Sequence, residues 1–527
     1  MPKPRRIVLF RGEGALAPAR IAQESSDAWR GARERSFPDR TAKKSRLWPR
    51  IGRGKARRMI LEQHYLACLS QASYLLGDEA TRTAIVVDPR RDVDDYIRRA
   101  SELGLVIRHV YLTHLHADFV AGHLELAART GADIRLGRKA RAEFEHVPLA
   151  DGDELVLGSL RIVALETPGH TPEGVSLLVW DLADPSGAPR AVLTGDTLFV
   201  GDVGRPDLAA SAGCDAAELA SQLYDSVRRL AALPPQVELH PGHGAGSACG
   251  KSLGKETSST IGAQLAANPM LAPMARERFV REALDGLPPA PAYFAHDARL
   301  NRGRRALLED LLSRATREAT LDEALELSRA GGLLLDARRS DDWARGHVAG
   351  SVQLGLDGRY ASWAGMLLDP EARLILVCEP GNEREAAIRL LRVGFENVAG
   401  VLRADPAAWA ARGVLRSTPR VDPAEARKLA EEPGASVLDV RAAGERDAVR
   451  IEGSTHIPLP ELERRWRELD RGRRWIVHCA GGWRSTIACS LLEARGFDAL
   501  VDVRGGMGAW AAAGLPCARG AGRGGAG

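Results

Sequence analysis

The sequence of 527 residues predicts a multi-domain α/β protein. In the first half, apolar runs repeatedly lead into Gly-rich turns that carry a histidine or an aspartate, which is typical of strands with functional side chains at their ends. In the second half, short motifs recur after 101 to 103 residues: Leu335 matches Leu438, and Cys378 matches Cys479. A hydrophobic content of 45% supplies several packed cores, so we expect one larger domain followed by two similar smaller ones.

The first chemical motif is Thr-His-Leu-His-Ala-Asp-Phe at residues 113–119. It resembles the HxHxDH signature of the metallo-β-lactamase fold, with Phe119 in place of the last histidine. In that fold the last histidine binds a second metal ion, and a phenyl ring has no lone pair to offer. The motif therefore predicts a single metal ion with open coordination positions, which suits O₂ chemistry better than two-metal hydrolysis.

Three later motifs supply further candidate ligands, namely His170, Asp196 and His243. Together with His114, His170 and Asp196 form a set of two imidazoles and one carboxylate. Such a facial triad leaves three positions for water, O₂ and a substrate sulfur, and it favours iron(II). We expect one Fe²⁺ per chain.

The remaining candidates are His116, Asp118 and His243. They are interpreted either as groups beside the metal ligands that orient water or the substrate, or as a remnant of a dinuclear ancestor. Zinc bound by His114, His116 and His170 stays open, because ligand choice does not follow from sequence alone.

Residues 59–302 resemble persulfide dioxygenases. The motifs that carry the resemblance lie at residues 113–123, 167–174, 193–208, 240–254, 268–269 and 293–294. The Phe119 variant is similar to bacterial members fused to rhodanese domains. The resemblance implies an αββα sandwich from residue 59 to about 255, with helices near Glu256–Leu284 and Arg304–Ser313, in a domain of residues 59–317. It also implies oxidation of the outer sulfur of a thiol persulfide to sulfite.

The Gly-rich loop after His243 contains two further candidates. Cys249 is predicted to be catalytic, because a thiol in this loop could accept or relay a sulfane sulfur; the alternative is a small residue packed in a turn. Lys251 is predicted to bind substrate by offering a cation to an acidic thiol carrier.

The second strong motif is His-Cys-Ala-Gly-Gly-Trp-Arg-Ser at residues 478–485. It follows an apolar strand-like run and precedes a helical stretch, so loop amides and a helix N-terminus should surround the Cys479 thiol and stabilise a persulfide. The motif and its flanking segments resemble the active loop of rhodaneses. This resemblance makes Cys479 the sulfur carrier, Arg484 an anion-binding catalytic group, and Gly482 and Ser485 parts of the substrate cradle.

The internal repeat predicts two rhodanese-like modules, at residues 318–418 and 419–519. In the first, the active loop reads Cys-Glu-Pro-Gly-Asn-Glu at residues 378–383. Carboxylates in this loop would repel an anion, and Pro380 removes an amide donor. The first module is therefore predicted to be a degenerate, structural copy, with sulfur transfer by Cys378 as the alternative.

The first 58 residues carry 17 Lys and Arg against 5 Asp and Glu, whereas the rest of the chain has a net charge of −8. Residues 1–58 are expected to be a disordered basic extension, read from too early a start; a nucleic-acid-binding arm or a transit peptide is the alternative. Residues 520–527 are expected to be a disordered tail. Scattered cysteines and the lack of a long apolar stretch predict a cytoplasmic protein without a membrane or nucleic-acid partner. A homo-oligomer stays open.

The predicted function has two steps. A low-molecular-weight thiol persulfide reacts with O₂ to give sulfite and free thiol, and Cys479 then passes sulfane sulfur to sulfite to give thiosulfate. Two alternatives are a glyoxalase II-like thioester hydrolase with two metal ions and a non-enzymatic sulfur-carrier or persulfide-sensing protein. The sequence does not name the thiol, which could be glutathione, coenzyme A or another carrier.

Overall fold

The structure is a computed structural model that describes residues 59–209 and 213–519. The predictions for residues 1–58 and 520–527 lie outside the described residues. Within the described part of the chain, no helix is both long and apolar enough to cross a membrane.

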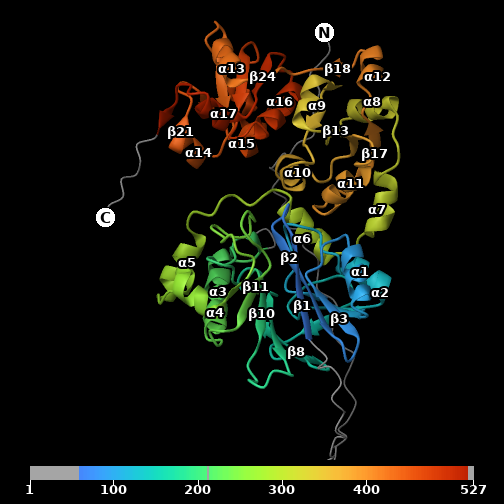
Figure 1. Ribbon diagram of the computed structural model, residues 1–527, viewed down its shortest axis with the longest axis vertical. Coiled ribbons are helices and arrows are strands. Elements are labelled where there is room, and N and C mark those ends of the chain that lie inside the picture. Colours follow the sequence, from blue (N-terminus) through green and yellow to red (C-terminus); the bar gives the residue numbers. More distant parts are fainter. Residues whose placement is uncertain (1–58, 210–212, 520–527) are drawn as a thin grey trace, which may run out of the picture.

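The N-terminal domain is built on two six-stranded sheets that face each other (Figure 1). Leu76, Ile85, Leu177 and Leu193 are among the side chains that form the apolar layer between the sheets. The strands of the first sheet, in spatial order, are β1 (Met59–Leu66), β2 (Gln71–Asp78), β3 (Thr83–Val87), β4 (Val106–Leu112), β5 (Asp133–Gly137) and β6 (Val147–Leu149). Those of the second sheet are β12 (Ser259–Thr260), β11 (Glu238–Pro241), β10 (Ala191–Gly195), β9 (Val175–Asp181), β8 (Leu160–Glu166) and β7 (Glu154–Leu157).

Helices cover the outer face of each sheet. On the first sheet, Tyr96 and Leu126 pack against Leu75 and Val110. On the second, the helical apolar residues Leu223, Val227 and Phe279 pack against Val192 and Leu239. The helices of this domain are α1 (Asp94–Glu102), α2 (His123–Thr130), α3 (Ala216–Ala231), α4 (Ile261–Ala267), the 3₁₀ turn η2 (Pro269–Leu271), α5 (Arg276–Leu284) and α6 (Phe294–Arg302). The predicted αββα sandwich is confirmed, whereas α6 was not expected from the sequence.

The first rhodanese-like module has a parallel sheet in the order β15-β13-β16-β17. Its first helix starts with a capping box, in which Thr320 and Glu323 exchange side-chain and backbone hydrogen bonds. The elements are α8 (Leu321–Arg329), β13 (Leu333–Asp336), α9 (Ser340–Arg345), β14 (His347–Val348), β15 (Val352–Gln353), α10 (Tyr360–Leu367), β16 (Leu374–Cys378), α11 (Glu383–Leu391), β17 (Val398–Arg403), α12 (Pro406–Ala411) and β18 (Leu415–Arg416).

The second module repeats this topology and adds the edge strand β19, which gives a parallel sheet in the order β19-β24-β23-β20-β22. A small antiparallel pair, β21 with β25, corresponds to the pair of β14 with β18 in the first module. The elements are β19 (Arg420–Val421), α13 (Pro423–Ala430), β20 (Ala435–Asp439), α14 (Ala443–Ala448), β21 (Val449–Arg450), β22 (Thr455–His456), α15 (Leu459–Arg465), η3 (Trp466–Glu468), β23 (Arg474–His478), α16 (Arg484–Ala494), β24 (Leu500–Val503), α17 (Gly506–Ala512) and β25 (Ala518–Arg519).

The N-terminal domain and the first module meet across a polar contact. Arg392 makes two 2.7 Å ion-pair contacts with Asp92, and its carbonyl accepts a 2.7 Å hydrogen bond from the amide of Val120. Helix α7 (Leu308–Ala315) lies within the predicted 59–317 unit, but it packs on β17 and α11 of the first module. The loop that carries the first chemical motif is therefore in direct contact with the first module.

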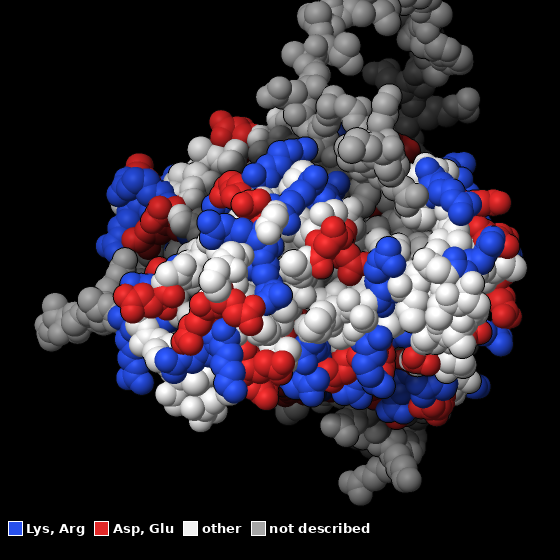
Figure 2. Space-filling model, turned by 90° about the horizontal axis from the view of Figure 1, so that it is seen from above, with Lys and Arg blue, Asp and Glu red and all other residues white. Residues whose placement is uncertain are grey.

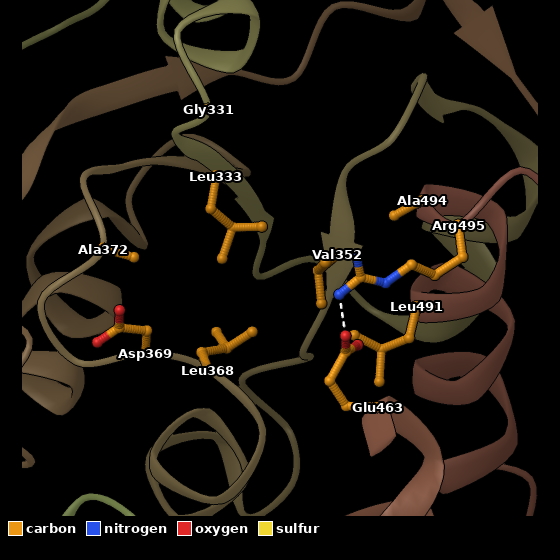
Figure 3. Close-up of a pocket in the computed structure, with 10 residues that line it drawn as sticks. All are labelled: Gly331, Leu333, Val352, Leu368, Asp369, Ala372, Glu463, Leu491, Ala494 and Arg495. Carbon is orange, nitrogen blue, oxygen red and sulfur yellow. Dashed lines mark hydrogen bonds and ion pairs between the residues drawn. The ribbon is translucent and has the colours of Figure 1, made fainter. Parts of the chain in front are cut away.

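The two modules also contact each other. A cavity between them is lined by apolar side chains that include Leu333, Val352 and Leu491, with the ion pair of Arg495 and Glu463 at its edge (Figure 3). On the face seen in Figure 2, basic and acidic side chains are interspersed.

Candidate metal centre and sulfur-transfer site

The predicted metal ligands come together where strands of the two facing sheets end. His114 follows β4, Asp196 follows β10, and His243 follows β11, while His170 lies in the turn between β8 and β9. The Nε2 atoms of His170 and His243 each lie 3.5 Å from Oδ2 of Asp196, and Nε2 of His114 lies 3.8 Å from the same oxygen. All four side chains are buried. Residues separated by up to 129 positions therefore surround one carboxylate oxygen.

Hydrogen bonds fix which nitrogen of each imidazole faces this oxygen. The Nδ1–H groups of His170 and His243 donate to the carbonyls of Arg205 (2.9 Å) and Ser70 (3.1 Å). Nδ1 of His114 lies 2.9 Å from the hydroxyl of Thr113, whose own proton goes to Asp88. Each Nε2 therefore presents a lone pair, as a metal ligand must.

His114, His170 and Asp196 form one group whose ligand atoms all lie within 4.8 Å of one another. His116, Asp118 and His243 form a second group at the same spacing. Nε2 of His243 lies 3.4 Å from Asp118 and 3.5 Å from Asp196, so Asp196 stands between the two groups.

The residues present fit a bound metal ion. Several buried polar atoms of the two groups have no hydrogen-bond partner among the described residues. These atoms are Nδ1 of His116, Oδ1 of Asp118, both carboxylate oxygens of Asp196, and Nε2 of His243. Buried polar atoms without partners are costly, and a bound cation would offset this cost for the atoms that it contacts. Burial and the neighbouring imidazoles also lower the pKa of His114 well below its ordinary value, which keeps it neutral.

Phe119 occupies the position of the missing ligand. Its ring is fully buried and lies 4.4 Å from the ring of His116. The second group therefore has an apolar wall where the HxHxDH signature places a further imidazole. Each group thus contains three candidate ligands, and Phe119 adds none to the second.

Two positioning residues were missed by the sequence analysis. Asp88 accepts hydrogen bonds from the amide and hydroxyl of Thr113 and lies 3.0 Å from Nε2 of His116. Although burial alone would lower the pKa of His116, the Asp88 carboxylate raises it. Asn301 on α6 donates to the carbonyls of His116 and Phe119 and accepts from Ala121. No local motif marks either residue, because each acts on a segment distant in sequence.

Cys249 lies beside the metal groups, whereas the side chain of Lys251 is directed elsewhere. The Cys249 thiol is buried and forms a ligand-spaced group with Asp196 and His243. Burial, and then the charges of Asp118 and Asp196, raise the pKa of the Cys249 thiol well above its ordinary value, so the thiol is neutral at neutral pH. The Lys251 ammonium donates to the carbonyl of Glu282 on α5.

The second module places Cys479 at the end of β23, where the motif predicts it. The amide of Gly482 donates to the Cys479 sulfur at 3.1 Å, and the Ser485 hydroxyl lies 3.6 Å from it. Gly482 has a φ of 79°, and a Cβ there would lie 2.5 Å from the amide nitrogen of Gly505, so only glycine fits. The thiol is buried within a loop that offers it hydrogen-bond donors.

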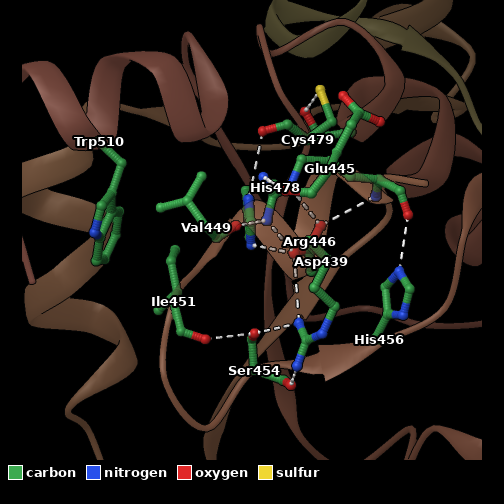
Figure 4. A network of polar contacts seen from close by, with 12 residues as sticks. Asp439, Glu445, Arg446, Val449, Ile451, Ser454, His456, His478, Cys479 and Trp510 are labelled. Atoms are coloured by element: carbon green, nitrogen blue, oxygen red, sulfur yellow. Dashed lines mark hydrogen bonds and ion pairs between the residues drawn. The ribbon is translucent and has the colours of Figure 1, made fainter. Parts of the chain in front are cut away.

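Arg484 is held beside this loop by an acidic residue. Its guanidinium makes two 2.7 Å hydrogen bonds with the carboxylate of Glu445 on α14. Figure 4 shows Glu445 near Cys479, above a network in which Asp439, Arg446 and Ser454 are joined by hydrogen bonds and an ion pair. An anion bound at Cys479 would therefore meet an arginine that is already oriented.

The corresponding loop of the first module differs in the way the sequence indicates. The amide of Gly381 donates to the carboxylate of Glu383 at 2.9 Å, so a residue of the loop itself takes this donor. Burial, followed by Asp336, Glu383 and Glu379, raises the pKa of Cys378 above its ordinary value. Cys378 is a neutral thiol in an acidic loop.

Comparisons with known proteins match this architecture. Residues 66–243 match the family model of the metallo-beta-lactamase superfamily, and residues 320–412 and 422–513 each match that of the rhodanese-like domain. The chain is 31% identical over 251 residues to a hydroxyacylglutathione hydrolase of Rhodospirillum rubrum, covering 47% of this chain and 87% of that protein.

Two solved structures are also similar. The crystal structure of a metallo-beta-lactamase from Staphylococcus aureus is 30% identical, with a TM-score of 0.59, and the match covers 67% of this chain and 100% of that one. The crystal structure of ETHE1 from Myxococcus xanthus is 33% identical, with a TM-score of 0.40, over 46% of this chain and 98% of that one. The chain belongs to the metallo-β-lactamase superfamily, and two rhodanese-like domains follow its metallo-β-lactamase domain.

Proposed function

We propose that the protein oxidises a low-molecular-weight thiol persulfide with O₂ and then transfers sulfane sulfur through Cys479. The observation that carries the first step is the metal centre: His114, His170 and Asp196 form a two-imidazole, one-carboxylate set, and Phe119 stands where a second ion needs a ligand. This donor set suits one Fe²⁺ with open positions.

One iron(II) ion held by His114, His170 and Asp196 would supply the binding and activation of O₂ and of the terminal persulfide sulfur. Thr113 and Arg205 hold the two imidazoles with Nε2 inward, and Phe119 keeps one wall dry. The reaction consumes one persulfide, one O₂ and one water, and it yields sulfite, free thiol and two protons. Cys249 lies close enough to the centre to contact a sulfur substrate.

The second step takes place at Cys479. The Cys479 thiolate first attacks the outer sulfur of a second thiol persulfide, whose S–S bond breaks and whose thiol leaves. The sulfur lone pair of sulfite then attacks the outer sulfur of the Cys479 persulfide, the S–S bond breaks, and its electron pair leaves with Cys479 as a thiolate. Thiosulfate is released. The Gly482 amide stabilises the sulfur anion, and Arg484 is placed to bind the oxyanion.

The partners that this function requires are a thiol persulfide, O₂, sulfite and thiosulfate, without nucleic acid or membrane. Free cysteines, seven in all, support a reducing cytoplasm as the location. A homo-oligomer is compatible with the proposal.

The deciding experiment measures O₂ uptake by iron-loaded enzyme across a panel of thiol persulfides, together with bound iron. We expect stoichiometric O₂ consumption and one iron per chain. A protein that only carries or senses persulfide sulfur would consume no O₂, and that result would refute the proposal.

A thioester hydrolase is the second candidate. It is favoured by the similarity to hydroxyacylglutathione hydrolase and by the second ligand group of His116, Asp118 and His243. Hydrolysis of this kind uses two metal ions, and Phe119 withholds a ligand from the second. Two zinc-type ions per chain, with turnover of a glutathione thioester, would select this function over the dioxygenase.

A further inference from the structure

A short segment of the first module lies between the loops of both sites. This segment comprises Leu356–Arg359, which connects β15 to α10. The guanidinium of Arg359 donates to the carbonyl of Gly246 at 2.9 Å, three residues after His243 and three before Cys249. One residue earlier, Gly358 faces Trp483, which stands next to Gly482 in the sulfur-transfer loop.

The contact with the sulfur-transfer loop is close. A Cβ on Gly358 would lie 2.3 Å from the ring of Trp483, so the indole fills the space that a side chain would take. The indole N–H donates to Asp357 at 3.4 Å, and the ring of Trp363 lies 6.2 Å away. The degenerate first module thus forms part of the surroundings of the active loop in the second.

A buried arginine of the first module holds this segment in place. The buried guanidinium of Arg389 on α11 donates to the carbonyls of Leu356 (2.6 Å) and Gly358 (2.8 Å). It also lies over the fully buried ring of Tyr360. The backbone that carries Arg359 is therefore held in place, although the Arg359 side chain is exposed.

Arg359 is a cation with unused donors. The described residues provide it with a neutral carbonyl partner and with no carboxylate, whereas nearby Arg339 faces Asp357 at 3.8 Å. Arg359 also lies within electrostatic range of Tyr293, whose hydroxyl is in turn within range of Asp118 and Cys249. Burial raises the pKa of Tyr293 well above its ordinary value, and Arg359 partly opposes this shift.

A small oxyanion that leaves the metal centre moves away from Asp118 and Asp196. Arg359 contacts the loop between His243 and Cys249, its neighbour Gly358 contacts Trp483, and a guanidinium binds oxyanions through paired, charge-assisted hydrogen bonds. We propose that Arg359 binds the sulfite released by the N-terminal domain and passes it, past Gly358 and Trp483, to the Cys479 loop. This inference rests on the proposed function.

The test uses the full-length, iron-loaded enzyme with a thiol persulfide and O₂, in the presence of an aldehyde dye that traps free sulfite. The measured quantity is trapped sulfite relative to thiosulfate, per O₂ consumed. For Arg359→Gln we expect this ratio to rise about tenfold, the size expected for loss of one charge-assisted contact. Arg359→Lys, which keeps the charge, should fall between this variant and the wild type.

Arg412→Gln is the matched control, since Arg412 is an exposed arginine of the same module that pairs with Asp322. Its ratio should equal that of the wild type. If Arg359→Gln gives the wild-type ratio while O₂ uptake is intact, the role of Arg359 is refuted and the proposed function stands. Absence of O₂ uptake by the wild type would instead overturn the proposed function.

Discussion

Nε2 of His243 lies 3.5 Å from Oδ2 of Asp196, the same carboxylate oxygen that His114 and His170 face. A single oxygen is therefore shared between the ligand group predicted to hold iron and the residues left over from a two-ion arrangement. The number of ions that bind depends on the other side chains around the second group. Phe119 stands there in place of the last histidine of the HxHxDH signature.

We predict that Phe119→His adds a second metal ion. The new imidazole would complete the group of His116, Asp118 and His243, which already lie at ligand spacing. Metal analysis should rise from one to two ions per chain, with O₂ uptake reduced and thioester hydrolysis gained. Phe119→Leu, which keeps an apolar wall, should stay at one ion. An unchanged metal content in both variants would refute the role given to Phe119.

We predict that Asp88→Asn weakens metal binding about 10- to 100-fold, the usual cost of removing an outer-shell partner. Asp88 orients His114 through Thr113 and contacts His116 directly. The measurement is a metal titration with a competing chelator. Asp78→Asn is the control, because Asp78 is an equally buried acid whose partners, Thr81 and Ser159, lie outside the site. Equal losses in both variants would mean that Asp88 only supports the fold.

We predict that Cys479→Ser abolishes sulfur transfer from thiosulfate to cyanide, whereas Cys378→Ser leaves it intact. The Gly482 amide donates a hydrogen bond to the Cys479 sulfur. In the loop of Cys378, the corresponding Gly381 amide donates to the Glu383 carboxylate instead. In the coupled reaction, Cys479→Ser should release mainly sulfite with O₂ uptake preserved. Equal losses of transfer from the two substitutions would contradict a silent first module.

We predict that acid destabilises the second module through His478. Burial lowers the pKa of His478 to about 4, so the folded module keeps this imidazole neutral, whereas the unfolded chain protonates it near pH 6.5. The resulting stability is complete above pH 6.5 and is lost as the pH falls towards 4, by up to about 3 kcal/mol.

Hydrogen exchange of β23 at pH 7.5 and 5 measures this effect. Strand β16 of the first module is an internal control, because it carries Val377 at the position of His478. Protection of the β23 amides, taken relative to the intrinsic exchange rate at each pH, should fall at low pH more than that of β16, and His478→Gln should remove the difference. Persistence of the difference in this variant would assign it to another group.

Much of the fold could be predicted from the sequence, because the signals are local. Apolar runs that end in Gly-rich turns indicated strands, and Asp196 and His243 lie just after two of these strands. The repeat that pairs Cys378 with Cys479 predicted two similar modules. Helix α6 was missed, because a short helix after a Pro-rich segment has weak periodicity, and Asn301 was missed with it.

The sequence by itself determined which side chains can do chemistry: the ligand types, the absent histidine at residue 119, and the carboxylates in the loop of Cys378. These follow from residue identity and short spacing. Only the tertiary structure decided that Asp196 faces three imidazoles, that Asp88 orients two of the candidate ligands, that Lys251 turns to Glu282, and that Arg359 reaches Gly246. Such contacts depend on packing between segments far apart in the chain, where rotamers and domain docking, and not local pattern, set the distances.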